Sequence, residues 1–184
     1  MNSDIKEIII THEQICQRSK ELADLINKDY AGKTPILLGM LKGSVPFLAE
    51  LIKSITIPME YDFMDVNSYF GGTESTGHIE IITDVTADLK GRDVIIVEDI
   101  VDTGFTLQEV MPLIRQKGVN SLEIVCLMDK PSGRKVENLV PKYIGFTVPK
   151  LFLVGFGLDY EQKYRNLPFV GVLKEEVYSK WKLH

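Results

Sequence analysis

Acidic and hydroxyl side chains follow one strongly apolar segment of this chain. Val94–Val97 leads directly into Glu98 and Asp99, and then into the pentapeptide Asp102–Thr106, which reads Asp-Thr-Gly-Phe-Thr. Open α/β sheets bind ligands at the carboxyl ends of their strands. A glycine and two hydroxyl residues before a helix leave amides free for a phosphate. We therefore predict a sugar phosphate as ligand, with its phosphate on the amides and its hydroxyls, or a Mg²⁺ ion, on the acids.

A purely structural interpretation of the same residues is also open. Asp102 and Thr103 would then cap a helix, and Glu98 and Asp99 would be solvated. The acidic pair favours a functional site, because it comes directly after a buried strand. Neighbouring residues of a strand point to opposite faces of a sheet. We therefore expect Glu98 and Asp99 to reach one ligand only if the strand frays at its tip.

Several other binding motifs are missing from the sequence. It contains no Gly-x4-Gly-Lys-Ser/Thr and no Gly-x-Gly-x-x-Gly after a strand, which weakens a nucleoside triphosphate or dinucleotide interpretation. The three histidines, His12, His78 and His184, have no spacing that suits zinc.

Strands alternate with helices along the chain, which predicts an α/β fold with a mostly parallel, twisted central sheet and helices on both faces. Helices are predicted from the capping box Thr11–Gln14 to about Lys28, over Val45–Lys53, and over Thr106–Lys117, where Gly118 ends the last one. Asn67–Gly77 is predicted to be a loop, and Leu167–His184 shows no clear pattern. Strands are predicted at Ile5–Ile10, Pro35–Leu41, Ile57–Val66, Ile79–Thr83, Asp93–Ile100, Ser121–Met128, Tyr143–Val148 and Leu151–Phe156.

Composition indicates one globular domain. The 184 residues are 45% hydrophobic and 26% charged, which excludes a disordered chain or a disulfide-stapled mini-domain. The net charge of −5 argues against a broad nucleic-acid-binding face but leaves room for a local cationic pocket. Cys16 and Cys126 are expected to be buried, reduced thiols. Since no apolar run reaches the ~20 residues of a membrane span and no signal peptide is recognisable, we expect a cytoplasmic protein without membrane partners.

Val94–Leu107 resembles the phosphoribosyl-pyrophosphate motif of the type I phosphoribosyltransferases, and nearly the whole chain resembles their hypoxanthine-guanine branch. The resemblance implies the type I phosphoribosyltransferase fold as one domain over residues 1–184. It also implies a mobile lid at about 67–77 and a small hood built from the N-terminal segment and about 149–184.

The same resemblance assigns roles around the motif. Glu98 and Asp99 would bind the ribose hydroxyls and magnesium. The loop that holds the 5′-phosphate would be Asp102, Thr103, Gly104, Phe105 and Thr106. Asp102 would also act at purine N7, either as general base or mainly as a hydrogen-bonding group that organises the phosphate loop.

Further roles follow for residues that face the pyrophosphate. Leu41, Lys42 and Gly43 resemble a short pyrophosphate loop in which a non-proline cis peptide precedes the lysine, although their spacing also suits an ordinary turn. Arg165 resembles the pyrophosphate-binding arginine. Ser68 and Tyr69 resemble the lid, although such a segment is often simply a flexible loop.

The base pocket is implied by residues near the end of the chain. Lys130 resembles the lysine that binds the purine 6-oxo group, although a lysine at the end of a strand is most often a surface charge. Phe152 resembles the ring that stacks on the purine, although an aromatic residue between apolar neighbours usually packs in the core. Asp159 resembles a second magnesium-linked acid near the base, and Leu153 would contribute backbone contacts there. Leu151 departs from the family, in which many members have a polar residue before the phenylalanine.

Taken together, the resemblance implies a magnesium-dependent transfer of the 5-phosphoribosyl group to hypoxanthine or guanine. It implies small-molecule substrates, no nucleic acid, and a homodimer or homotetramer. Two alternatives stay open: a transferase that prefers xanthine, and an RNA-binding regulator of pyrimidine genes with the same fold, which the net charge of −5 disfavours.

Overall fold

The computed structural model describes residues 2–68 and 79–179. Its central sheet has the strand order β4-β3-β2-β5-β6-β7. Within the described ranges every neighbouring pair is parallel except β3 and β4, as the alternation of strands and helices predicts. The strands are β2 (Ile36–Met40), β3 (Glu60–Ser68), β4 (Ile79–Thr83), β5 (Asp93–Val101), β6 (Ser121–Asp129) and β7 (Tyr143–Thr147).

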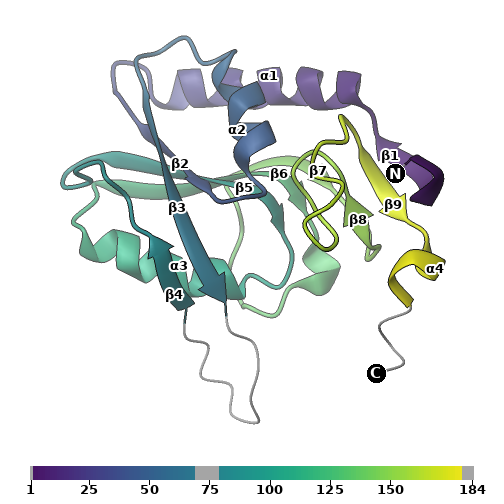
Figure 1. The fold of residues 1–184 in the computed structure, drawn as a ribbon. Helices are drawn as coiled ribbons and strands as arrows, with labels where there is room; N and C mark the ends of the chain where they lie inside the picture. The colour runs from purple at the N-terminus through teal and green to yellow at the C-terminus, as the bar shows by residue number, and fades with distance from the viewer. Residues whose placement is uncertain (1, 69–78, 180–184) are drawn as a thin grey trace.

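Helices cover both faces of this sheet. The helices α1 (His12–Asp29) and α2 (Val45–Ile52) lie on one face, and α3 (Phe105–Gln116) lies on the other (Figure 1). Alternate residues of β5 enter the two cores: Ile95 and Val97 pack with α1 and α2, and Val94 and Ile96 pack with α3. Burial on both faces is the reason why β2 and β5 read as continuous apolar runs.

A second, smaller sheet is built from segments near the two ends of the chain. It has the order β1-β9-β8, with β1 (Ile5–Ile10), β8 (Leu153–Val154) and β9 (Val170–Leu173) in antiparallel pairs. It stands beside the central sheet, and the short helix α4 (Glu175–Tyr178) follows it (Figure 1). These segments are the ones from which a hood is predicted.

Local signals at the helix ends are confirmed. Thr11 and Gln14 form the predicted capping box at the start of α1: the Thr11 amide donates to Gln14 at 2.8 Å. Gly118 has the positive φ of +79° that a helix-ending glycine adopts. No helix among the described residues is long and apolar enough to cross a membrane.

Several predicted boundaries are wrong. The predicted strand Leu151–Phe156 shortens to β8, because Gly155 and Phe156 take positive φ values of +97° and +45° and leave the extended conformation. The unpatterned end of the chain contains β9 and α4. The predicted strand at Ile57 begins only at Glu60.

Three further predictions need correction. Asn67 and Ser68, predicted as loop, belong to β3, because they pair with the edge strand β4. The helical spacing of Ile15, Leu22, Leu25 and Ile26 predicts that all four lie on the apolar face of α1, but Leu25 is 46% exposed. Cys126 is buried as predicted, whereas Cys16 is half-buried, and both are free thiols.

Candidate functional site

A cavity of about 280 Å³ lies at the carboxyl ends of β2 and β5. It contains both acids of β5 and most of the segment that leads into α3. This is the end of an open α/β sheet at which ligands bind. The lining residues are Met40, Leu41, Gly43, Val66, Glu98, Asp99, Ile100, Val101, Asp102, Thr103, Gly104, Thr106 and Leu107.

The acidic pair reaches this cavity in a different way from the predicted one. The strand β5 does not fray after Glu98, since it stays paired with β6 through Ile100 and Val101. Instead its other neighbour, β2, pairs with β5 only as far as Val97. The carboxyl half of β5 is therefore open on that side, and Glu98 and Asp99 both line the cavity.

Burial makes both acids unusually weak. Burial and the neighbouring Asp99 charge raise the pKa of Glu98 well above its ordinary value. Burial also raises the pKa of Asp99 to about 6. The Ile100 amide, which donates to Asp99 at 2.7 Å, and the charge of Arg165 lower this pKa, but burial has the larger effect. Both groups would hold their charge more readily beside a cation.

The segment Leu41–Gly43 packs directly against the acidic pair. The Leu41–Lys42 peptide bond is cis, as the resemblance implies. A Cβ atom on Gly43 would lie 1.7 Å from Oδ2 of Asp99, and one on Gly157 would lie 1.9 Å from the Gly43 carbonyl oxygen. No side chain larger than hydrogen fits at either position without displacing its neighbour.

The pentapeptide Asp102–Thr106 forms the turn into α3. Gly104 is the N-cap, with a φ of +86° that suits glycine, and it has no side chain of its own to cap the helix. The structural interpretation is wrong for Asp102, whose side chain pairs with Lys130 instead, but it holds for Thr103, whose hydroxyl accepts from the Phe105 amide at 3.4 Å. Thr103, Gly104 and Thr106 line the cavity. Backbone amides at a helix N-terminus are common ligands of a phosphate.

Lys130 and Asp102 form an ion pair at the rim of the cavity. The Lys130 Nζ atom donates to Oδ2 of Asp102 at 2.8 Å, and only 14% of the Lys130 side chain is exposed. Lys130 is therefore not a solvated surface charge. On its other side, Asp102 packs so closely on Gly133 that a Cβ atom there would lie 1.7 Å from Oδ1.

Asp159 and Arg165 form a second ion pair in the loop between β8 and β9. Arg165 Nη2 lies 2.8 Å from Oδ1 of Asp159, and Arg165 Nη1 donates to the Gly157 carbonyl at 2.6 Å. The Nε–H group of Arg165 is buried without a partner among the described residues. Because the charges of Asp159 and Arg165 act on Asp99, this loop lies close to the acidic pair.

Phe152 offers a partly open ring at the small sheet. The Phe152 side chain is 38% exposed, so it is not a core side chain. One of its faces stacks on Tyr178 at 4.6 Å between ring centroids, and Tyr160 meets it edge-on at 5.6 Å. Leu153 beside it is buried in β8.

The remaining predicted lid residues give no site geometry. Ser68 is the last residue of β3, and Tyr69 lies outside the described residues.

Sequence reasoning missed the residues that contact the backbone of the pentapeptide and of Val101 before it. Arg134 donates to the carbonyls of Val101 and Asp102, and its guanidinium pairs with Asp129. Gly133 supplies the close approach to Asp102. The available signal was the run Lys-Pro-Ser-Gly-Arg-Lys directly after a buried strand, at the ligand-binding end of the sheet.

Comparisons with known proteins show which family the chain is similar to. A family model described as a phosphoribosyl transferase domain matches residues 6–161. The hypoxanthine-guanine phosphoribosyltransferase of Lactococcus lactis is 54% identical over 180 residues, which are 98% of this chain and 97% of that protein. The protein of the same name from Streptococcus pneumoniae is 52% identical over 97% of this chain and 99% of its own length.

A solved structure shows the same similarity in three dimensions. The hypoxanthine phosphoribosyltransferase of Staphylococcus aureus superposes with a TM-score of 0.93 at 49% identity, over 97% of this chain and 96% of that chain. Motif, cavity and nearly full-length similarity lead to one conclusion. The chain belongs to the phosphoribosyltransferase family, in the branch of the hypoxanthine-guanine phosphoribosyltransferases.

Proposed function

We propose that this protein transfers the 5-phosphoribosyl group of 5-phosphoribosyl 1-pyrophosphate to N9 of hypoxanthine or guanine, giving IMP or GMP and pyrophosphate. One observation carries the proposal: a single cavity is lined by Glu98, Asp99 and most of the pentapeptide Asp102–Thr106. The acids proposed for the ribose hydroxyls and most of the loop proposed for the phosphate thus line one cavity, and Lys130 pairs with Asp102 at its edge. The relatives described above bear the names of enzymes for these bases.

The sugar phosphate would lie along β5. Its ribose hydroxyls would bind Glu98 and Asp99, and its 5′-phosphate would bind the amides and hydroxyls of Thr103, Gly104, Phe105 and Thr106 at the start of α3. A dianionic phosphate is favoured at a helix N-terminus because the backbone amides and the helix dipole both act on it.

The purine would lie between Lys130 and Phe152. Lys130 would donate to the 6-oxo group, and Asp102, at 2.8 Å from Lys130, would face the adjacent N7. Phe152 would stack on the base with the part of its ring that Tyr178 and Tyr160 leave exposed. Backbone groups near Leu153 and Asp159 would contact the 2-position.

Magnesium fits the acids of this site. Neither Glu98 nor Asp99 accepts a hydrogen bond from a cationic side chain within the described ranges, and burial raises the pKa of both. Those ranges hold no group of three or more His, Cys, Asp or Glu side chains placed to bind a metal. Mg²⁺ typically takes one or two carboxylates and completes its shell with substrate oxygens and water. We propose Glu98, Asp99 and, across the site, Asp159 as the acids concerned.

Pyrophosphate would leave toward Leu41–Gly43 and Arg165. The amides of Lys42 and Gly43 and the guanidinium of Arg165 would bind its oxygens, and bound Mg²⁺ would neutralise further charge. As the bond to C1 breaks, the ribose becomes oxocarbenium-like. Glu98 and Asp99 would stabilise this positive charge, because they are fixed beside the ring before the reaction starts. The segment at about 67–77, with Ser68 and Tyr69, would exclude water as a lid.

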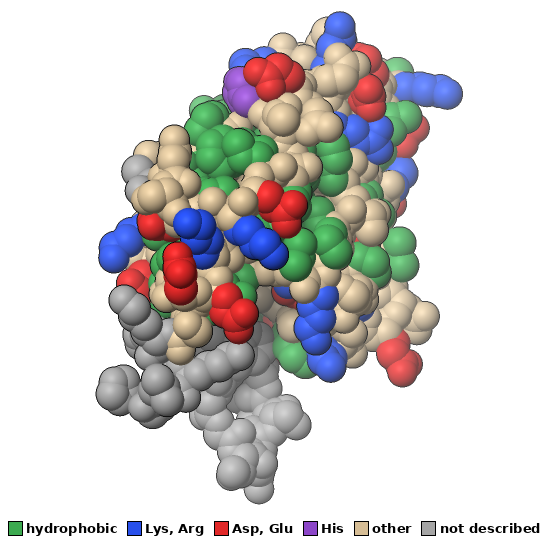
Figure 2. Space-filling view, turned by 90° about the vertical axis from the view of Figure 1, so that its right-hand side faces the viewer, with side chains coloured by type: hydrophobic (Ala, Val, Ile, Leu, Met, Phe, Trp, Pro, Cys, Tyr) green, Lys and Arg blue, Asp and Glu red, His purple; other side chains and the backbone are tan. Residues whose placement is uncertain are grey.

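The test is the turnover of hypoxanthine, guanine, xanthine and uracil with phosphoribosyl pyrophosphate at saturating magnesium. We expect kcat/KM for hypoxanthine or guanine to exceed that for xanthine at least about tenfold, with no turnover of uracil. A preference for xanthine would replace the proposed substrate. Binding of RNA without turnover of any base would replace the enzyme by a regulator, although Figure 2 shows acidic and basic side chains intermixed on the face it presents.

We also propose one domain over residues 1–184 with a hood at the small sheet, acting as a homodimer or homotetramer. Exposed apolar side chains at the sheet edge, such as Ile81 and Ile82, support association, and sedimentation would measure it. Free thiols at Cys16 and Cys126 support a reducing compartment, the cytoplasm.

A further inference from the structure

Three consecutive residues that line the cavity have their backbone carbonyls bound by one neighbouring segment. The carbonyl oxygens of Val101, Asp102 and Thr103 all accept hydrogen bonds from one segment, residues 130–136, which follows β6. The donors are the Lys130 amide to Val101 (3.0 Å), Arg134 Nε to Asp102 (2.9 Å), Arg134 Nη2 to Val101 (3.1 Å), and the Lys135 and Val136 amides to Thr103 (2.9 and 3.2 Å).

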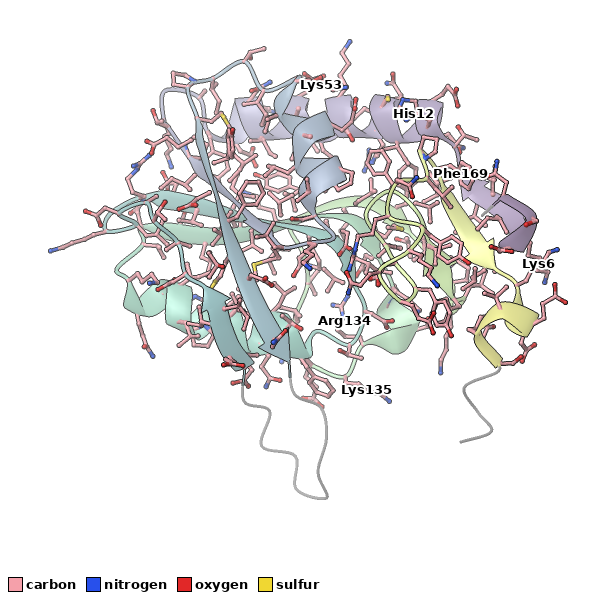
Figure 3. The ribbon with its side chains drawn as sticks, in the orientation of Figure 1. Lys6, His12, Lys53, Arg134, Lys135 and Phe169 are labelled. Carbon is pink, nitrogen blue, oxygen red and sulfur yellow. The ribbon has the colours of Figure 1, made fainter. Side chains whose placement is uncertain are left out.

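Arg134 holds the largest share of these contacts with one side chain. Besides the two carbonyls of the loop, its guanidinium donates to the Leu139 carbonyl and pairs with the carboxylate of Asp129. The side chain is 14% exposed. It lies with Lys135 on the α3 side of the central sheet (Figure 3). A planar guanidinium with five donors can join several acceptors at fixed angles, which a lysine cannot do.

The segment also packs against the turn itself. A Cβ atom on Gly104 would lie 2.6 Å from Leu139 Cδ2 and 3.2 Å from Arg134 Cδ. Gly104 therefore packs directly against the side chains of Leu139 and Arg134. In a planar trans peptide the carbonyl and the amide that follows it point in opposite directions. Because residues 130–136 bind the carbonyls of residues 101–103, the amides of Asp102, Thr103 and Gly104 turn to the other side of the chain, and these three residues line the cavity, where an anion needs donors.

We propose that Arg134 is the positioning residue of the 5′-phosphate site: it fixes the carbonyls of Val101 and Asp102 on the far side of the loop. Its own charge is matched by Asp129, so it acts through geometry. The inference rests on the proposed function, because it assumes that a 5′-phosphate binds at Asp102–Thr106.

The experiment compares IMP with inosine, which lacks the phosphate. Affinities of both are measured by calorimetry for the wild-type protein, Arg134→Met and Arg134→Lys, below the unfolding midpoint of each. Arg18→Met is the matched control, because Arg18 also donates to two carbonyls, Gly145 and Ile144, and pairs with an acid, Glu21, but neither Arg18 nor any of these partners lines the cavity.

Arg134→Met is expected to weaken IMP binding about tenfold or more, and inosine binding by less than about twofold. Arg134→Lys should show most of the same loss, since it keeps the charge and loses the planar fork. If Arg134→Met does not fold, Arg134→Lys carries the test. Arg18→Met should lower the unfolding midpoint and leave the ratio of the two affinities unchanged.

Three results would overturn the inference. These are an unchanged ratio of IMP to inosine affinity in the Arg134 variants, wild-type affinity for IMP in Arg134→Lys, and the same loss of ratio in Arg18→Met. If the wild-type protein itself does not prefer IMP to inosine, the proposed function fails first, and the inference fails with it.

Discussion

Lys130 donates to Asp102 across 2.8 Å, and the two residues come from the ends of neighbouring parallel strands, β6 and β5. A 6-oxopurine presents an acceptor at its 6-oxo group and, beside it, N7. The pair therefore offers a cation and an acid side by side to two neighbouring atoms of one base. When no base is bound, Lys130 and Asp102 pair with each other, so neither partly buried charge is left without a partner.

Lys130→Ala should therefore act on the base and not on the sugar. Loss of a hydrogen bond from a charged group costs about 1.5–3 kcal/mol, so we expect kcat/KM for hypoxanthine to fall about tenfold to a hundredfold. Binding of phosphoribosyl pyrophosphate should change little. Steady-state kinetics with each substrate varied in turn measures both. An equal loss in both binding steps would instead indicate that Lys130 serves to hold Asp102 in the fold.

Gly43→Ala should disable the site by displacing Asp99, because the new Cβ atom would lie 1.7 Å from Oδ2 of that residue. A displacement on the scale of 1 Å at a reacting centre can cost about a hundredfold in rate, and we expect a fall of that order in kcat/KM. Gly91→Ala is the control. It meets no atom within 4 Å, but its φ of +71° makes alanine cost about 1–2 kcal/mol of stability. Similar losses of activity in both variants would contradict this explanation.

Much of this site could be predicted from sequence because its signals are local. The apolar run of β5 followed by Glu98 and Asp99 marks the end of a central strand, and the glycine at 104 marks a turn into a helix. Both properties belong to a few consecutive residues. The route by which Glu98 and Asp99 share one cavity was not local: it depends on where the neighbouring strand β2 ends.

The role of Arg134 could not be predicted in this way. Its acceptors include backbone carbonyls of Val101 and Asp102, more than thirty positions earlier, and a carbonyl leaves no mark on the residue type. The small sheet was missed in part for a similar reason. β1 and β9 pair between the two ends of the chain, and β8 is only two residues long before Gly155 turns the backbone.

Tyr178→Ala tests whether the ring of Phe152 must be supported from behind. Stacked aromatic pairs contribute about 0.5–1.5 kcal/mol beyond their buried area, so we expect the KM for hypoxanthine to rise about two- to tenfold. The KM for phosphoribosyl pyrophosphate should stay the same. Tyr61→Ala is a matched control, because Tyr61 also pairs with a phenylalanine, Phe63, but lies on β3 and is 57% exposed. A rise in both KM values for Tyr178→Ala would indicate a general disturbance of the small sheet.

Asp99 should make the free protein less stable as the pH rises. Burial raises its pKa in the folded state to about 6, whereas its ordinary value is 3.8. Between these values the folded protein holds a proton at Asp99 that the unfolded chain has released. The stability associated with this proton is fully present below about pH 4 and is lost as the pH rises through about 6.

A rise of about two in the pKa of Asp99 corresponds to about 3 kcal/mol. This is the largest fall in the free energy of unfolding that Asp99 can cause over this pH range. Asp99→Asn should remove this part of the slope in urea unfolding measured from pH 4 to pH 7. Asp93→Asn is the control of opposite sign, because hydrogen bonds from Ser121 and Asn120 lower the pKa of Asp93. Asp93 therefore contributes stability that is lost only as the pH falls below its ordinary pKa of 3.8, so Asp93→Asn should leave the slope between pH 4 and pH 7 unchanged. If Asp99→Asn and the wild-type protein show the same slope, Asp99 is not the buried acid that opposes folding at neutral pH. Its proposed need for a cation would then lose its physical basis.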